Sequence, residues 1–128
     1  MKPARSAVVV DDDAGIRELV ALHLGELGFD VVHAPDGNEG LRLALDHEPD
    51  LLVVDVRMPG MSGYDVTREV RRLLPGYVRV LLMTGSILAS DLAEGFEAGA
   101  DAYLKKPFTR QDLRERIESL LVLVPGSE

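Results

Sequence analysis

Five side chains that can do chemistry stand at the ends of short apolar runs in this sequence. Asp11 and Asp12 close the first run, Asp55 closes the third, Thr84 closes the fourth, and Lys106 stands just past the fifth. Three carboxylates brought within a few ångströms repel one another, so at least one takes up a proton unless a cation lies among them. Mg²⁺ fits such a group because it prefers oxygen ligands, and these run ends carry no histidine or cysteine to favour zinc.

The same residue types suit the transfer of a phosphoryl group. An aspartate at the end of a buried strand can act as a nucleophile and form an aspartyl phosphate, and it needs no general base because it is already ionised. A divalent ion and Lys106 would neutralise the phosphoryl oxygens, and the Thr84 hydroxyl can donate a hydrogen bond to the product. With Mg²⁺ and the Lys106 ammonium, three positive charges would balance the three carboxylates.

This chemistry requires a fold that brings the ends of separate apolar runs together. Each run is followed by a segment with apolar residues three and four positions apart, which predicts five repeats of strand and helix. Such alternation favours a parallel sheet with right-handed crossovers and helices on both faces. The expected strands are Ala7–Asp11, Val31–Ala34, Leu51–Asp55, Arg79–Thr84 and Ala102–Lys105.

The order of the strands follows from which runs end in polar residues. The second run ends in Ala34 and Pro35 and offers no reactive group. In the flavodoxin-like order 2-1-3-4-5 the second strand lies at the edge of the sheet, and the first and third are neighbours where the order reverses. We therefore predict an α/β, doubly wound (βα)5 fold with a five-stranded parallel sheet in this order and a ligand site beyond the carboxyl ends of the strands.

Length and composition restrict the remaining possibilities. The chain has 128 residues, 46% of them apolar, which suits one domain and is too short for two. We expect the domain to span residues 1–124 and residues 125–128 to be a disordered tail or the start of a linker. The net charge of −8 disfavours direct binding of nucleic acid. The sequence has no apolar run long enough for a bilayer, no secretory signal and no cysteine, so we expect a cytoplasmic protein without membrane contact.

Four segments together resemble the receiver domain of bacterial two-component response regulators. They are VVVDDDAGIREL, LLVVDVRMPGMSGYD, VLLMTGS and AGADAYLKKPF, in this order and each at the end of a predicted strand. The match extends from about Ala7 to about Val122. The resemblance implies a phosphoprotein of a two-component phosphorelay, which accepts and loses a phosphoryl group without turning over a free substrate.

The resemblance also implies a role for each matching residue. Asp55 would be the phosphoacceptor. Mg²⁺, which Mn²⁺ could replace, would be bound by Asp11, Asp12, Asp55 and the backbone carbonyl of Arg57. Thr84 and Lys106 would stabilise the phosphoryl group, Thr84 and Tyr103 would form the switch pair, and the peptide bond between Lys106 and Pro107 would be cis.

The implied partners follow from the same resemblance. The phosphoryl donor would be a sensor histidine kinase, a phosphotransfer protein or a small acyl phosphate. The output would be a domain or target protein that contacts the face made by the fourth helix, the fifth strand and the fifth helix. A homodimer that forms on phosphorylation is a further expectation.

Two other functions share these features and stay open. An Mg²⁺-dependent phosphohydrolase with an aspartyl nucleophile would have the same fold class, but such enzymes usually place a second aspartate two residues on, where this chain has Arg57. A non-phosphorylated adaptor would keep the fold with a vestigial site. Tyr103 has an alternative role as an ordinary half-buried aromatic. Outside the site, we expect Asp13 to cap a helix and Arg68, Arg71 and Arg72 to form one solvated helix face.

Overall fold

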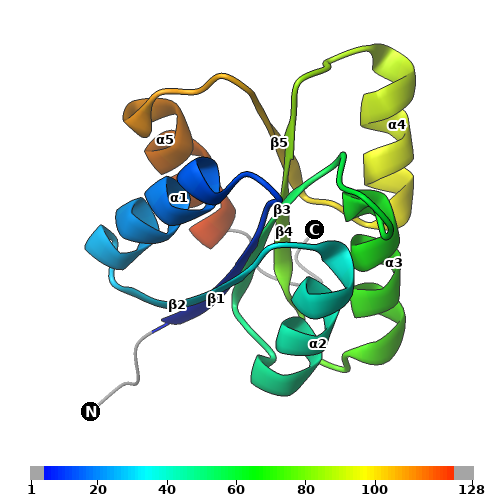
Figure 1. Cartoon of the computed structure of the whole chain (residues 1–128), viewed down its shortest axis with the longest axis horizontal. Helices are drawn as coiled ribbons and strands as arrows, with labels where there is room; N and C mark the ends of the chain where they lie inside the picture. The colour runs from blue at the N-terminus through cyan, green and yellow to red at the C-terminus, as the bar shows by residue number, and fades with distance from the viewer. Residues whose placement is uncertain (1–4, 123–128) are drawn as a thin grey trace.

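Residues 5–122 are described by a computed structural model, in which five strands alternate with five helices. The strands form one parallel sheet in the order β2-β1-β3-β4-β5, which confirms the predicted fold (Figure 1). The strands are β1 (Arg5–Val10), β2 (Phe29–Ala34), β3 (Leu51–Asp55), β4 (Arg79–Thr84) and β5 (Ala102–Lys105). The helices are α1 (Ala14–Glu26), α2 (Gly37–His47), α3 (Gly63–Leu73), α4 (Ala89–Ala98) and α5 (Arg110–Leu121).

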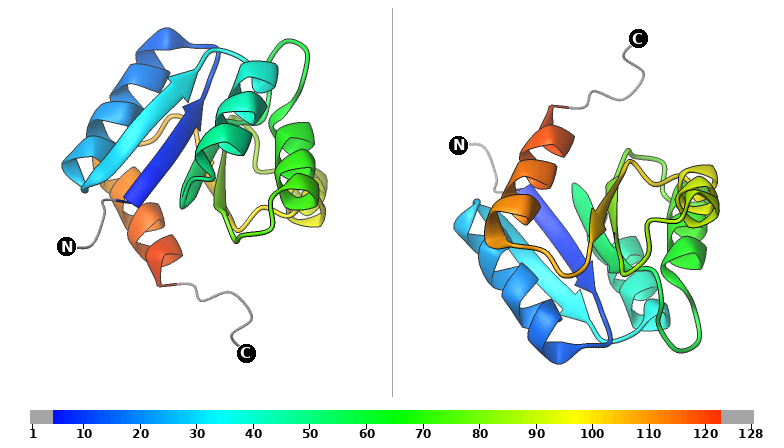
Figure 2. Two further views of the ribbon diagram at one scale, coloured as in Figure 1. Left: turned by 90° about the horizontal axis from the view of Figure 1, so that it is seen from below. Right: turned by 90° about the horizontal axis from the view of Figure 1, so that it is seen from above.

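Helices cover both faces of the sheet, α1 and α5 on one side and α2, α3 and α4 on the other (Figure 2). Side chains of a strand alternate between the two faces. Val8 and Val10 of β1 therefore pack in the core under α2, α3 and α4, while Ala7 and Val9 pack under α1 and α5. Because both faces are covered, every residue of the central strand β3 is buried, which explains its unbroken apolar run.

Two strands begin two residues earlier than the apolar runs indicated. We expected strands from Ala7 and Val31, but β1 starts at Arg5 and β2 starts at Phe29. In the parallel register Arg5 pairs with Phe29, and Ser6 pairs with Asp30. Backbone pairing continues here although three of these four side chains are polar, because β2 is an edge strand and Asp30 is exposed.

Local side-chain caps set where the helices begin. The Asp13 side chain accepts a hydrogen bond from the Ile16 N–H and caps α1, as predicted. Thr109 and Asp112 form a reciprocal capping box at the start of α5, and α3 begins with another such box. The cap of α1 matters for the site because it turns the chain into a helix directly after Asp11 and Asp12.

The prediction for the arginines of α3 is wrong for one of them. Arg68 and Arg72 are exposed and pair with acidic residues close to them on the surface. The Arg71 side chain is only 25% exposed, and its guanidinium donates twice to the Gly99 carbonyl and once each to the Val78 carbonyl and the Asp101 carboxylate. Arg71 therefore ties α3 to the carboxyl end of α4.

Within residues 5–122, no helix has the length and apolar character needed to cross a membrane. The tail expected over residues 125–128 lies outside the described part of the chain.

Candidate metal centre

Three carboxylates meet at the carboxyl edge of the sheet, as the strand order predicted. Asp11 and Asp12 follow β1, and Asp55 ends the adjacent strand β3. One carboxylate oxygen of each residue lies within 4.8 Å of the corresponding oxygens of the other two. Asp11 and Asp55 are buried, and Asp12 is exposed. The cluster thus has an open side toward solvent, which an entering ion or substrate requires.

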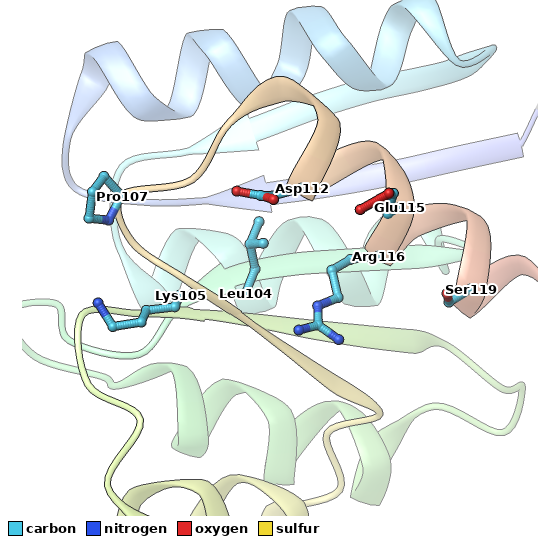
Figure 3. A pocket seen from close by; sticks show the side chains of 7 residues that line it. All are labelled: Leu104, Lys105, Pro107, Asp112, Glu115, Arg116 and Ser119. Atoms are coloured by element: carbon cyan, nitrogen blue, oxygen red, sulfur yellow. The ribbon is translucent and has the colours of Figure 1, made fainter.

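Lys106 places an ammonium group against two of these carboxylates. Its Nζ lies 2.8 Å from Asp11 Oδ2 and 3.0 Å from Asp55 Oδ1. The Lys106 N–H donates to the Thr84 carbonyl, and the following peptide bond to Pro107 is cis. The neighbouring Lys105 has an exposed side chain that lines a groove between β5 and α5 (Figure 3). Only the second lysine of the pair therefore reaches the acidic cluster.

The charges of the cluster do not balance without a further cation. Three carboxylates and one ammonium leave two net negative charges when all are ionised. Burial raises the pKa of the Asp55 carboxyl; the hydrogen bond from Lys106 opposes this shift, and the charges of Asp11 and Asp12 add to it. Burial lowers the pKa of Lys106, but the hydrogen bonds to Asp11 and Asp55 together with the charges of these carboxylates outweigh that effect and raise the pKa overall. A hard divalent cation with an all-oxygen donor set fits both the charge and the ligand types.

The loop after Asp55 folds back closely on the end of β3. The Gly63 N–H donates to the Val56 carbonyl, and a Cβ atom at Gly63 would lie 2.4 Å from the Asp55 carbonyl oxygen. The side chain of Arg57, in this loop, is exposed. Only glycine fits at position 63 without moving the backbone beside Asp55, a requirement that the sequence analysis missed because the contact is between backbone segments.

A second residue missed by the sequence analysis is Arg17 of α1. Its Nη1 donates to the Asp11 carbonyl at 2.9 Å, and its Nε donates to His33 Nδ1 at 3.1 Å. The guanidinium thus holds the backbone of the acidic loop against the edge strand β2. Its position, one turn after the helix cap Asp13, was the available sequence signal.

Thr84 lies at the same edge of the sheet, but its hydroxyl is engaged elsewhere. Thr84 is buried, and its Oγ1 accepts from the Ser86 N–H and donates to the Ser86 carbonyl, both at 3.1 Å. The Ser86 hydroxyl in turn donates to Asp91 Oδ2 at 2.8 Å. Hydrogen bonds therefore run from Thr84 through the β4–α4 loop to the first turn of α4.

Tyr103 lies away from the carboxylates, beneath α4. It is buried, and its hydroxyl donates to the Asp91 carbonyl at 2.7 Å and to the Leu92 carbonyl at 3.1 Å. Tyr64 of α3 donates to the same Asp91 carbonyl at 3.0 Å. Burial raises the pKa of the Tyr103 phenol, and the adjacent Tyr64 phenol raises it further, so the phenol stays protonated as a donor at neutral pH. Two tyrosines from different elements thus hold one carbonyl of α4.

Residues 7–118 match the family model described as the response regulator receiver domain. The chain belongs to this family. Receiver domains are components of two-component signalling. Their role is regulatory, and they are not classical enzymes.

Relatives of this receiver domain include longer proteins. A protein of Porphyridium aerugineum named "Probable transcriptional regulator ycf27" is 39% identical over 114 residues, which are 89% of this chain and 47% of that protein. The chain thus spans about half the length of this relative. The signal receiver domain of NarL from Mycobacterium tuberculosis is 32% identical with a TM-score of 0.85, covering 95% of this chain and 100% of that one. The chemotaxis protein CheY4 of Vibrio cholerae is 29% identical with a TM-score of 0.86, covering 92% and 99%.

Proposed function

We propose that Asp55 accepts a phosphoryl group in an Mg²⁺-dependent reaction and that the resulting aspartyl phosphate changes the surface formed by α4, β5 and α5. The observation that carries the proposal is the group of three carboxylates with Lys106 3.0 Å from Asp55. Asp11, Asp12 and Asp55 would hold the ion, with the Arg57 carbonyl as a further ligand, and Mn²⁺ would substitute for Mg²⁺. When bound, the ion would supply positive charge to the phosphoryl oxygens.

The transfer step needs only groups that this chain provides around Asp55. A carboxylate oxygen of Asp55 donates an electron pair to phosphorus, and the bond from phosphorus to the donor breaks with its electron pair staying on the donor. For a phosphohistidine donor whose other ring nitrogen carries a proton, the electron pair of the broken bond stays on the leaving nitrogen and the product is a neutral imidazole. Lys106 already faces the attacking carboxylate and would neutralise the charge of the transferred group. Hydrolysis of the product by water returns Asp55 to its ionised form.

Thr84 would connect this event to α4. Its hydroxyl can donate to the phosphoryl group only if it gives up its bond to the Ser86 carbonyl. Phosphorylation adds about −1.5 to −2 charges and strong acceptors at one place, which favours that exchange. The released loop would alter the first turn of α4, because Ser86 also holds Asp91. The switch pair Thr84 and Tyr103 then acts through the backbone of α4.

The surface of α4, β5 and α5 is the proposed contact for an output domain, a target protein or a second copy of the chain. Ile87, Leu88 and Phe96 expose 57%, 67% and 52% of their surface at the start and on the outer side of α4. On the other side of β5, charged residues of both signs line the groove to α5 (Figure 3). A relative about twice as long as this chain supports an output domain as the partner. A sensor histidine kinase or a phosphotransfer protein would supply the phosphoryl group.

Intact mass after incubation with Mg²⁺ and acetyl phosphate tests the proposal. We expect one phosphoryl group per wild-type chain, none with EDTA, and none in Asp55→Asn. Asp30→Asn is the matched control because Asp30 is an exposed carboxylate on β2, and it should incorporate normally. Incorporation that persists in Asp55→Asn would place the acceptor elsewhere.

The same reaction separates the alternatives. Sustained release of inorganic phosphate, proportional to time and without accumulation on the protein, would identify a phosphohydrolase. The exposed Arg57 two residues past Asp55 argues against that activity, because no carboxylate stands there to act as acid and base. Absence of both incorporation and release would identify an adaptor.

A further inference from the structure

Gly95 of α4 lies directly against the hydroxyl of Tyr103. A Cβ atom built at Gly95 would lie 1.8 Å from Tyr103 Oη and 2.6 Å from its Cζ, and 2.7 Å from Leu82 Cδ1. The phenol end of Tyr103 therefore occupies the volume that any other residue at position 95 would fill with its own side chain. This is the closest approach to a side chain among the glycines of the described structure.

The backbone gives no other reason for glycine at this position. Gly95 lies inside a helix, and it is not among the described residues with positive φ. Glycine destabilises a helix interior relative to alanine because it loses more conformational freedom on folding. Space for the tyrosine is thus the feature that requires glycine here.

The inward position of Tyr103 depends on that space. In the inward position, the Tyr103 hydroxyl donates to the Asp91 and Leu92 carbonyls in the first half of α4. The ring packs edge to face on Phe96, with the ring centroids 5.3 Å apart. A rigid phenol ring cannot bend away from a Cβ at 1.8 Å, so it must rotate about χ1 or push α4 outward. Because β5 is the edge strand, rotation takes the ring toward solvent without displacing another strand.

We propose that Gly95 is a positioning residue that admits Tyr103 beneath α4, so that side-chain volume at position 95 determines whether the tyrosine faces the helix or the solvent. Thr84 and Tyr103 point to the same face of the sheet. Tyr103 is paired with Leu82 in the parallel register, and Thr84 follows Leu82 by two residues on β4, so all three side chains lie on one face. Tyr103 already lies inward while the Thr84 hydroxyl is bonded to Ser86. The room for the ring in this chain therefore comes from Gly95 and does not require Thr84 to move. The link to signalling rests on the proposed function; the conformational claim does not.

Fluorine NMR of the full chain labelled with meta-fluorotyrosine tests the conformational claim. Tyr64, Tyr77 and Tyr103 are the three tyrosines of the sequence, and Tyr→Phe variants assign their signals. We expect Gly95→Ala to move the Tyr103 signal toward that of free tyrosine and to increase its relaxation by a soluble gadolinium chelate severalfold. The matched control is Gly25→Ala, also inside a helix but with open space at the Cβ position, and it should leave Tyr103 protected. A Tyr103 signal that stays protected in Gly95→Ala would overturn the proposal.

Thermal unfolding of a double variant keeps the test independent of folding defects. Gly95→Ala should lower the melting temperature of the wild-type chain, yet raise it in a Tyr103→Ala background. There the colliding ring is absent, the Leu82 methyl group 2.7 Å from the new Cβ can move into the space that the ring leaves, and alanine improves the helix. A decrease in both backgrounds would show that Tyr103 is not the cause. Both measurements use the unphosphorylated protein, so they are unaffected if Asp55 proves not to be phosphorylated. If the proposed function is correct, Gly95→Ala should still incorporate phosphate at Asp55 while Tyr103 remains outward.

Discussion

The Lys106→Met substitution removes the one ammonium group that the described structure places between two buried carboxylates. The Lys106 side chain is 20% exposed, whereas those of Asp11 and Asp55 are 0% and 9% exposed. Removing one partner of a buried ion pair costs about 3–5 kcal/mol, because the remaining charge is left unpaired. Partial exposure of Lys106 places the expected loss near the lower end, at about 3 kcal/mol at pH 7 without Mg²⁺.

This loss converts into a readily measured change in melting temperature. For a domain of this size, each kcal/mol shifts the melting temperature by about 4 °C, so Lys106→Met should melt about 12 °C below wild type in EDTA. Lys105→Met is the matched control, because Lys105 is the adjacent lysine and its exposed ammonium, within residues 5–122, donates to the Lys106 carbonyl and to no carboxylate. It should change stability by about 0.5 kcal/mol or less.

The pH dependence of the loss distinguishes charge from packing. Without Lys106 the pKa of Asp55 should rise further, so a proton neutralises the unpaired carboxylate as the pH falls. Differential scanning calorimetry in EDTA should therefore show the gap between Lys106→Met and wild type narrowing from pH 7 to pH 5. An equal gap at both pH values, or an equal loss in Lys105→Met, would refute the electrostatic reasoning.

Two further predictions concern stability. Arg71→Met should lower the free energy of unfolding by about 2–3 kcal/mol, because it leaves the Val78 and Gly99 carbonyls and Asp101 without a charged donor. The control Arg72→Met removes an exposed arginine and should change the free energy of unfolding by about 0.5 kcal/mol or less. Equal effects of the two variants in urea unfolding would contradict the role of Arg71. The raised pKa of Asp55 means that the folded protein binds this proton more tightly than the unfolded chain does, so the contribution of Asp55 to stability falls as the pH rises above about 4. Urea unfolding in EDTA should thus show Asp55→Asn gaining stability over wild type as the pH rises from about 4 to 7, and a difference that shrinks over this range would show that the sign is wrong.

The sheet and the meeting of the carboxylates could be predicted because both depend on local patterns and a general rule of topology. Buried strands such as β3 must be apolar on both faces, and the carboxyl ends of neighbouring parallel strands must meet. The starts of β1 and β2 could not be found this way. Arg5 and Asp30 take part in strand pairing through their backbone groups, and a pattern of side-chain hydrophobicity cannot predict such pairing.

The wrong prediction for Arg71 and the absence of a prediction for Gly95 have a common physical origin. Helical spacing alone does not distinguish Arg71 from the solvated Arg72. The Arg71 guanidinium nevertheless donates to the Val78 and Gly99 carbonyls, which come close to it only after α3 and α4 pack together. Gly95 and Tyr103 likewise meet only through the packing of a helix on a strand. Sequence periodicity identifies the face of an element but not the atoms that another element brings to it.

The attachment of α4 has a mechanical consequence. Its carboxyl end is bound by the paired hydrogen bonds from Arg71 to Gly99, whereas its opposite end is held by tyrosine hydroxyls and by Ser86, whose partners can change. A rigid-body tilt of α4 about Gly99 would therefore move the amino-terminal end of the helix most. Ten residues give a helix about 15 Å long, so a tilt of about 10° would displace the Ala89 end by about 3 Å while Gly99 stays in place.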